Sequence, residues 1–308
     1  MGFWDGYWKT LKPLDVEEPI DVWVHRPLAY VLARAANPTP ISPNMITIAS
    51  IVLGVAAGVC MFLPFEYHLQ VAGLSLFSSA VLDCADGQLA RMRGTSSAFG
   101  RMLDGTADLV VSIATVAGGS FVVWSKYREP TWLGVVALAL CAVTIVTGSF
   151  HTSTYDHYKN LFLRFTHPTF SEGEDYETAL DRHRAAPRAG SFGVRVAWLA
   201  YLFYVKRQSE YVRNFDPQAA VRFSELPPFD PERAAIYRAH VGGVMRVWRT
   251  YFGFGSLVFG ISVSVALGVV EYYMLLRLVL LNAVFYGYLR PEQRRATAAA
   301  FRSMGLAR

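Results

Sequence analysis

The chain is organised around one stretch, Asp83-Cys-Ala-Asp-Gly-Gln-Leu-Ala-Arg91, which eight residues separate from Gly100-Arg-Met-Leu-Asp-Gly-Thr-Ala-Asp108. Its four carboxylates form two pairs, Asp83 with Asp86 and Asp104 with Asp108, and each pair lies at the edge of a long apolar run. Acidic side chains at membrane depth are costly and normally face a polar interior or an ion. We therefore treat these four acids as candidate functional residues.

The spacing of the acids predicts that they share helix faces. At about 100° per residue, one face of a helix carries Asp83, Asp86, Gly87 and Ala90, and a second face carries Gly100, Asp104 and Asp108. Two antiparallel helices joined by a short loop would aim all four carboxylates into one space, where their repulsion requires bound cations. Oxygen ligands without Cys or His favour Mg²⁺ or Mn²⁺ over zinc, and two such ions would balance the four charges.

The small residues beside the acids have two possible roles. Gly87, Ala90 and Gly100 leave room for a ligand as large as a nucleotide, and Arg91 adds a fixed positive charge suited to phosphate oxygens. Small residues also allow close helix packing in membranes. For any one of these positions, both a ligand pocket and helix packing stay open as interpretations. Packing alone does not explain four acids in the same segment.

This segment resembles the signature of the CDP-alcohol phosphotransferases, membrane enzymes of phospholipid synthesis, which reads Asp-x2-Asp-Gly-x2-Ala-Arg-x8-Gly-x3-Asp-x3-Asp. All specified positions are present, namely Asp83, Asp86, Gly87, Ala90, Arg91, Gly100, Asp104 and Asp108. Upstream, Ile41-Ser-Pro-Asn-Met-Ile-Thr47 is similar to the Pro-Asn-x-x-Thr entry to the family's first transmembrane helix. The resemblance covers the region from Asn37 to Asn160 well and the last two apolar spans only in general plan.

The resemblance implies an enzyme that transfers a substituted phosphate group from a CDP-alcohol to the hydroxyl of an alcohol acceptor and releases CMP. CDP-diacylglycerol is the expected donor, and a homodimer is expected because the family commonly forms one. We expect Asp83, Asp86 and Asp104 to bind the metal. Asp108 is expected to be a further ligand and also the base that takes the acceptor's proton.

The expected nucleotide pocket combines two parts of the chain. Gly87, Ala90, Gly100 and Arg91 would form it, and Asn44 and Thr47 would cap it from the first helix.

Length and composition indicate an all-α, polytopic membrane protein. The chain has 308 residues, of which 53% are hydrophobic. Six apolar stretches approach the roughly 20 residues needed to cross a bilayer, so we expect six transmembrane helices. These stretches comprise residues 44–64, 67–90, 101–124, 132–152, 249–268 and 270–289.

Basic residues predict the orientation. The loops near residues 65, 127 and 270 contain only Lys126 and Arg128 as basic residues, whereas the opposite side carries many arginines. The positive-inside rule therefore places both termini and the acidic motif on the cytoplasmic side of a cytoplasmic (inner) membrane. The net charge of +5 is explained by these loops, and no nucleic-acid partner is expected.

The remaining segments complete the expected domain plan of 1–43, 44–152, 153–248, 249–289 and 290–308. The first is a cytoplasmic segment whose helix from Pro19 to Ala36 is amphipathic; it lies on the membrane lipids or, alternatively, packs on the cytosolic domain. The second and fourth contain the transmembrane helices, and the last is a basic tail suited to anionic lipids. In the cytoplasmic insertion 153–248, we expect an irregular polar loop from Phe170 to Ser191 and helices from Phe192 to Phe215 and from Pro231 to Val247.

Two other functions compete with the enzyme. A divalent metal-ion transporter would use the four acids as its translocation site, but Arg91 and the position of the acids at one membrane face count against it. A catalytically inactive scaffold would not require the intact signature. The sequence does not distinguish among acceptors such as glycerol phosphate, inositol phosphate and serine.

Overall fold

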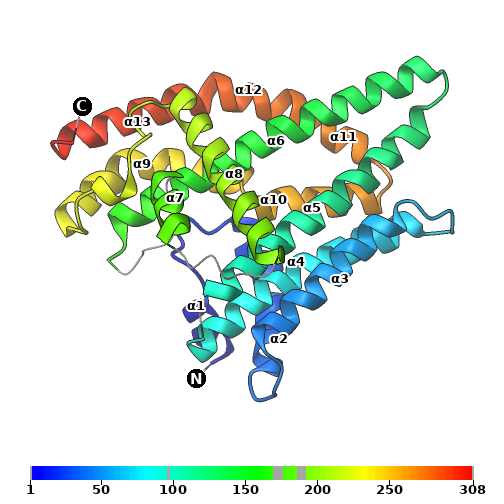
Figure 1. Cartoon of the computed structure of the whole chain (residues 1–308), viewed down its shortest axis with the longest axis horizontal. Coiled ribbons are helices and arrows are strands. Elements are labelled where there is room, and N and C mark those ends of the chain that lie inside the picture. The colour runs from blue at the N-terminus through cyan, green and yellow to red at the C-terminus, as the bar shows by residue number, and fades with distance from the viewer. Residues whose placement is uncertain (1, 96–97, 169–175, 186–191, 307–308) are drawn as a thin grey trace. The chain divides into compact units, whose positions relative to one another are not determined.

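A computed structural model describes residues 2–95, 98–168, 176–185 and 192–306. Within these ranges the chain forms helices and connecting turns, with no strand (Figure 1). It divides into two compact units, which are described separately. Unit 1 comprises Met1–Thr147 and Phe254–Leu280, and unit 2 comprises Gly148–Gly253 and Leu281–Arg308.

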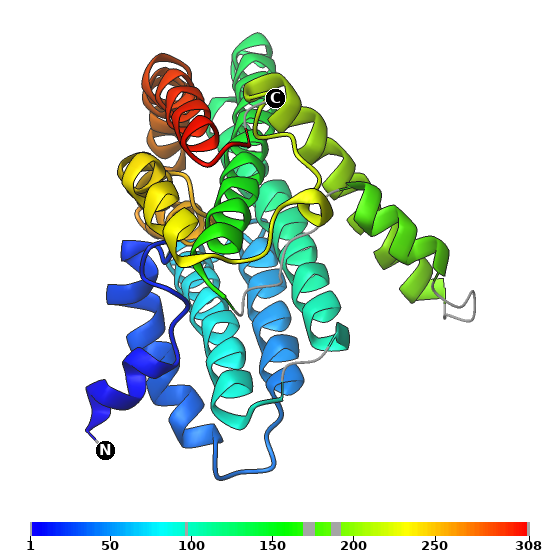
Figure 2. The same ribbon diagram turned by 90° about the vertical axis from the view of Figure 1, so that its left-hand side faces the viewer.

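Unit 1 contains the acidic motif and is built around three long helices. These are α3 (Pro43–Cys60), α4 (His68–Arg93) and α5 (Ala98–Tyr127). Helix α3 packs against both α4 and α5, and the three run side by side (Figure 2). The unit also contains α1 (Phe3–Lys9), a π-turn (Asp21–His25), α2 (Arg26–Ala36), the first part of α6 (Thr131–Thr166), α10 (Phe254–Ala266) and α11 (Val270–Leu275). Helices α2 and α10 pack on α4, so the motif helix has neighbours on several sides.

Local sequence signals explain where the motif helices begin and end. The side chain of Ser42 accepts a hydrogen bond from the backbone N–H of Met45, and Pro43 occupies the first turn of α3. Helix α4 ends at Gly94, whose φ of +63° is favourable for glycine. The N–H of Thr95 then donates to the carbonyl of Ala90, 3.0 Å away. These caps place the acids near the end of α4 and the start of α5.

Small residues let the helices of unit 1 approach closely. Ala29 and Ala33 of α2 are fully buried with Ala85 and Leu89 of α4 in one apolar cluster. Between α3 and α5, a Cβ atom added at Gly58 would stand 2.6 Å from the carbonyl oxygen of Ala114. This contact leaves no room for a side chain at Gly58, so glycine sets the spacing of the two helices.

Among the described residues, four helical stretches are long and apolar enough to cross a membrane. They are Pro43–Cys60, Leu103–Tyr127, Thr131–Thr166 and Val270–Ser303. Outward apolar side chains such as Val52 and Val146, which are 60% and 62% exposed, suit contact with lipid.

We expect six membrane spans, and the described residues contain four helical stretches that are long and apolar enough to be spans. The expected second span, helix α4, carries two acids and two arginines toward its end. The expected fifth span is interrupted, because α9 (Pro231–Tyr251) ends before α10 begins at Phe254, and α10 has only 13 residues. The six-span plan remains a prediction.

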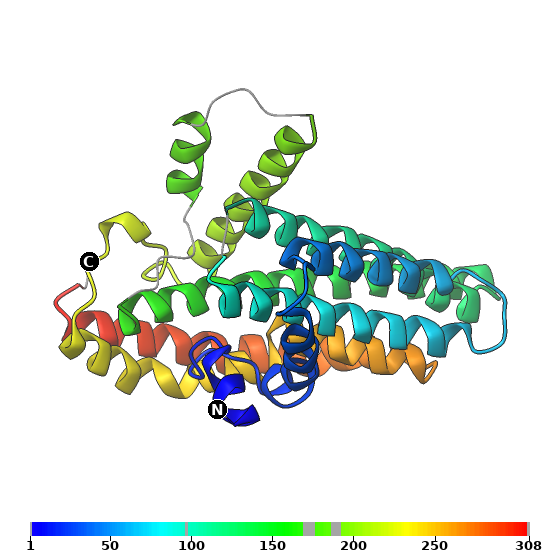
Figure 3. The same ribbon diagram turned by 90° about the horizontal axis from the view of Figure 1, so that it is seen from below.

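Unit 2 is centred on a buried tryptophan. Its helices are the remainder of α6, α7 (Tyr176–Ala185), α8 (Phe192–Phe215), α9, α12 (Asn282–Val284) and α13 (Arg290–Ser303), with a 3-10 turn at Phe223–Glu225 and a π-helical stretch at Phe285–Leu289. Helices α9 and α13 lie side by side (Figures 1 and 3). The indole N–H of Trp248 on α9 donates to Gln293 Oε1 on α13 at 2.8 Å, and its ring packs against Phe215 and Phe285.

The insertion and the tail differ in part from expectation. The helix expected from Phe192 to Phe215 is confirmed as α8, and a helix begins at Pro231 as predicted. The prediction of an irregular loop from Phe170 to Ser191 is wrong over Tyr176–Ala185, which forms helix α7. Glu, Ala, Leu and Arg favour a helix there, and His183 packs against Trp198 of α8. The rest of that loop lies outside the described residues. The basic tail is largely helical, because α13 packs on α9.

The close approach of α3 and α5 yields a stability prediction. Replacing Gly58 by Ala should lower the stability of unit 1 by about 1–3 kcal/mol, because the added methyl group overlaps a backbone oxygen. Gly119→Ala is the matched control, since no atom lies within 4 Å of the added Cβ. Thermal unfolding of both variants in detergent micelles measures the effect. Equal melting temperatures for Gly58→Ala and the unsubstituted chain would show that the helices separate freely at this contact.

Candidate functional site

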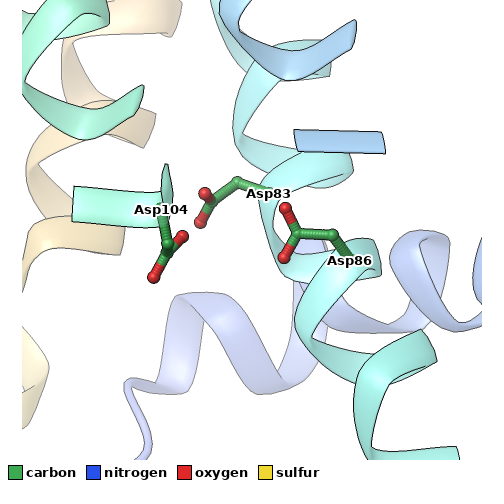
Figure 4. Close-up of side chains that lie close together, drawn as sticks. All are labelled: Asp83, Asp86 and Asp104. Atoms are coloured by element: carbon green, nitrogen blue, oxygen red, sulfur yellow. The ribbon is translucent and has the colours of Figure 1, made fainter. Parts of the chain in front are cut away.

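Three acids of the motif converge in unit 1. Asp83 and Asp86 project from α4 and Asp104 projects from α5, and their carboxylates point toward one another (Figure 4). One oxygen atom from each lies within 4.8 Å of the other two. Asp86 is buried, Asp83 is half-buried and Asp104 is exposed, so the cluster is open on the Asp104 side.

The cluster has the chemistry of a divalent cation site. Carboxylates this close repel one another strongly when ionised, and a bound cation removes that cost. All three ligands are hard oxygen donors with no Cys or His among them, which suits Mg²⁺ or Mn²⁺. The residues therefore fit the expected metal, and the expectation for Asp83, Asp86 and Asp104 agrees with their geometry.

The fourth acid lies outside this group of three. Asp108 follows Asp104 by one turn of α5 and is half-buried. It lies within electrostatic range of Asp83. Its charge acts on Asp83 together with those of Asp104 and Asp86, so Asp108 shares the electrostatic environment of the three acids.

A buried arginine lies close to the cluster. Arg26 of α2 forms an ion pair with Glu17, with 3.0 Å between Nε and Oε2, and both side chains are buried. Arg26 is also within electrostatic range of Asp83. The charge of Arg26 is balanced by Glu17, and this buried pair ties the N-terminal segment to α2.

The first turns of α3 supply a hydroxyl to the site. Thr47 is buried, and its hydroxyl donates a hydrogen bond to Asp86 Oδ2. Its oxygen also lies 3.2 Å from the carbonyl of Pro43. This hydrogen bond orients the carboxylate of Asp86, as outer partners of metal ligands commonly do. Asn44 lies one turn earlier and is half-buried, so it stands on the same part of α3 as expected.

The small residues of the motif lie where the sequence predicts. Gly87 follows Asp86 directly, and a Cβ atom added there would stand 3.4 Å from Nη1 of Arg91. The guanidinium of Arg91 therefore lies back along α4 over Gly87. Ala90 is half-buried near the end of α4, and Gly100 is half-buried near the start of α5.

Sequence reasoning did not identify three polar residues that support the motif. Arg91 Nε donates to the carbonyl of Thr10 at 2.6 Å, and Gln88 Nε2 donates to Thr10 Oγ1 at 3.0 Å. Arg93 donates through its two terminal nitrogens to the carbonyls of Ala36, Asn37, Thr39 and Ile41, at 2.7–3.0 Å. These contacts involve backbone oxygens or residues far away along the chain, so no local pattern reveals them.

Comparison with known proteins finds a family match for part of the chain. Residues 40–165 match the family model described as CDP-alcohol phosphatidyltransferase, which confirms the predicted resemblance over this segment. All eight motif residues lie inside the match.

Curated relatives carry related names. The chain is 34% identical over 121 residues to a phosphatidylinositol phosphate synthase of Mycobacteroides abscessus, covering 39% of this chain and 51% of that protein. It is 27% identical over 121 residues to a CDP-diacylglycerol–serine O-phosphatidyltransferase of Helicobacter pylori, covering 39% and 47%. It is 36% identical over 90 residues to an archaetidylinositol phosphate synthase of Pyrococcus horikoshii, covering 27% and 45%. The chain spans about half the length of the curated relatives it matches.

The contact between Thr47 and Asp86 yields a metal-binding prediction. Thr47→Val should weaken Mn²⁺ binding about 10- to 100-fold, because Asp86 loses the hydroxyl that orients it. Thr144→Val is the matched control, since that hydroxyl also bonds the carbonyl four residues earlier, at 2.8 Å, and lies on α6 away from the motif. Isothermal titration of the purified chain with Mn²⁺ measures both. Unchanged affinity in Thr47→Val would remove Thr47 from the metal site.

Proposed function

We propose that this chain, whose residues 40–165 form a CDP-alcohol phosphatidyltransferase domain, transfers a substituted phosphate group from a CDP-alcohol to an alcohol acceptor and releases CMP. CDP-diacylglycerol is the proposed donor. The observation that carries the proposal is the convergence of Asp83, Asp86 and Asp104 beside Arg91, within the segment that matches the family.

The acids are proposed to hold divalent metal, with Mg²⁺ or Mn²⁺ as the fitting ions and two ions as the expected number. When bound, such ions balance the negative charge of the carboxylates and of the donor's diphosphate. Asp83, Asp86 and Asp104 are the ligands that the geometry supports, and Asp108 is a further candidate.

The other motif residues are proposed to bind the donor. Arg91 carries a permanent charge that pairs with phosphate oxygens. Gly87, Ala90 and Gly100 leave the helix surfaces open for the nucleotide, and Asn44 and Thr47 close the pocket from α3. Because Arg91 is exposed while Asp86 is buried, the pocket would admit the donor from the side of Arg91.

The proposed reaction is an in-line displacement at phosphorus. The acceptor's hydroxyl oxygen forms a bond to the phosphorus that carries the donor's alcohol. The bond between that phosphorus and the bridging oxygen breaks, and the electron pair leaves with CMP. Asp108 accepts the proton from the acceptor hydroxyl as this bond forms.

The acceptor and the setting are also part of the proposal. Inositol phosphate and serine are the first acceptors to test, because those groups occur in the names of the relatives. The active site and both termini are proposed to face the cytoplasm, and the chain is proposed to act as a homodimer in the membrane.

A turnover assay tests the function directly. The purified full chain in lipid nanodiscs is mixed with radiolabelled CDP-diacylglycerol and a panel of alcohols, and release of CMP is measured with and without each acceptor. We expect acceptor-dependent release that stops in EDTA and returns with Mg²⁺ or Mn²⁺. Failure of a folded, helical chain to release CMP with any acceptor would reject the transferase. Full turnover in EDTA would reject the metal.

The proposed role of Asp108 as the base yields a prediction that separates it from the metal ligands. Asp108→Asn should still bind the donor but turn over about 10²–10⁴-fold more slowly, because the base is lost, and added metal should not restore the rate. Asp83→Asn should weaken metal affinity as well as rate, and excess metal should recover part of the rate, because Asn keeps one oxygen ligand. Donor affinity and turnover across a metal titration distinguish the two. Equal rescue of both variants by metal would make Asp108 a ligand instead of the base.

A further inference from the structure

The N-terminal segment lies outside the region that matches the family, yet it touches the motif. The family match begins at residue 40, whereas Thr10 caps the C-terminal end of α1. Thr10 is buried and contacts two residues of α4, Gln88 and Arg91, across 78 and 81 positions of sequence. A part of the chain outside the family match therefore reaches a residue of the signature.

The hydroxyl of Thr10 takes part in two buried hydrogen bonds. It donates to the carbonyl of Tyr7 at 2.7 Å and accepts from Gln88 Nε2 at 3.0 Å. Tyr7 and Gln88 are both fully buried. Leaving the buried amide of Gln88 without an acceptor would cost free energy, so these hydrogen bonds fix Thr10 against α4.

The carbonyl of Thr10 in turn fixes the guanidinium of Arg91. Arg91 Nε donates to this oxygen at 2.6 Å, a charge-assisted hydrogen bond. The terminal nitrogens then lie above Gly87, at 3.4 and 3.6 Å from where a Cβ atom would stand. In this orientation Arg91 is within electrostatic range of Asp86.

Other contacts fix the segment that carries Thr10. The carboxylate of Glu18 accepts hydrogen bonds from the backbone N–H of Gly255 and of Ser256, at 3.2 and 2.8 Å, at the start of α10. Glu17 pairs with Arg26 of α2, which packs on α4. The segment from Thr10 to Arg26 is therefore tied to several helices of unit 1, and it provides a firm support for an exposed arginine.

We propose that Thr10 is a positioning residue, which holds Arg91 over Gly87 so that the guanidinium faces the phosphates of the donor. This role rests on the proposed function, because it assigns the donor's phosphate to Arg91. An unsupported arginine at an exposed helix end samples many rotamers and loses that freedom on binding. The carbonyl of Thr10 removes most of this freedom before the donor arrives, and so increases affinity for the donor.

The first experiment measures Arg91 without any turnover. Phenylglyoxal modifies accessible, mobile arginines, and peptide mass spectrometry reports the rate at Arg91 in the full chain. Thr10→Val removes the hydroxyl and leaves Gln88 without its acceptor, so Arg91 should react about fivefold to tenfold faster. Thr10→Ser keeps the hydroxyl and should restore the original rate. Thr147→Val is the control, because that hydroxyl also bonds the carbonyl three residues earlier, at 3.2 Å, on α6.

The second experiment connects the change to the donor. Thr10→Val should raise KM for CDP-diacylglycerol about fivefold to tenfold with a smaller change in kcat, because it disturbs the binding of a phosphate. In an Arg91→Ala background, Thr10→Val should change KM no further, since its effect passes through Arg91. Thr10→Val/Gln88→Met removes both polar partners, which avoids a buried amide without an acceptor if the single variant unfolds, and it still removes the hydrogen bond that holds Thr10 against α4.

The outcomes separate the two proposals. Unchanged modification of Arg91 in the folded Thr10→Val or double variant overturns the role of Thr10, whether or not the chain is a transferase. If Thr10→Val raises KM equally in the unsubstituted and the Arg91→Ala backgrounds, the role of Thr10 is also overturned, because its effect on KM would not pass through Arg91. Absence of CMP release from the unsubstituted chain rejects the transferase alone, and the modification rates still decide the position of Arg91.

Discussion

Repulsion among three carboxylates is the constraint on which unit 1 depends. Asp83, Asp86 and Asp104 have oxygen atoms within 4.8 Å of one another, an arrangement that is costly without compensation. Neighbouring parts of the chain provide that compensation from different directions. Thr47 donates to Asp86 from α3, and Arg26 of α2, which is paired with Glu17, lies within electrostatic range of Asp83. Close packing at Gly58 then keeps α3 against α5, so the groups that support the acids remain aligned with them.

Periodicity predicted the acidic site well because the site is local. Two helices with the acids at intervals of three and four residues, joined by a short connection, bring Asp83, Asp86 and Asp104 together with little help from the rest of the fold. Helix α8 was also predicted at its observed bounds, since glycines and a proline precede its apolar run and a proline follows it. The role of Asp108 stays a prediction, because helix spacing gives the direction of a side chain around the axis but not the chemistry it performs.

Other features depend on contacts that a linear pattern does not contain. Helix α7 was missed because its segment is polar, although it contains good helix formers and packs on α8. The break between α9 and α10 divides one apolar stretch into two helices, although hydrophobicity continues across it. Thr10 was missed for a simpler reason. A backbone oxygen has no sequence signature, and its partner Arg91 is 81 positions away.

The contacts of Arg93 have a consequence for variation at that position. One guanidinium reaches the carbonyls of Ala36, Asn37, Thr39 and Ile41 through both of its terminal nitrogens. A lysine keeps the positive charge but places all its donors on one small ammonium group, which lacks the planar fork. The positive charge would survive such an exchange, while the closure of the Asn37–Ile41 turn would not. The shape of this side chain therefore matters as well as its charge, and a tally of basic residues underestimates what it contributes.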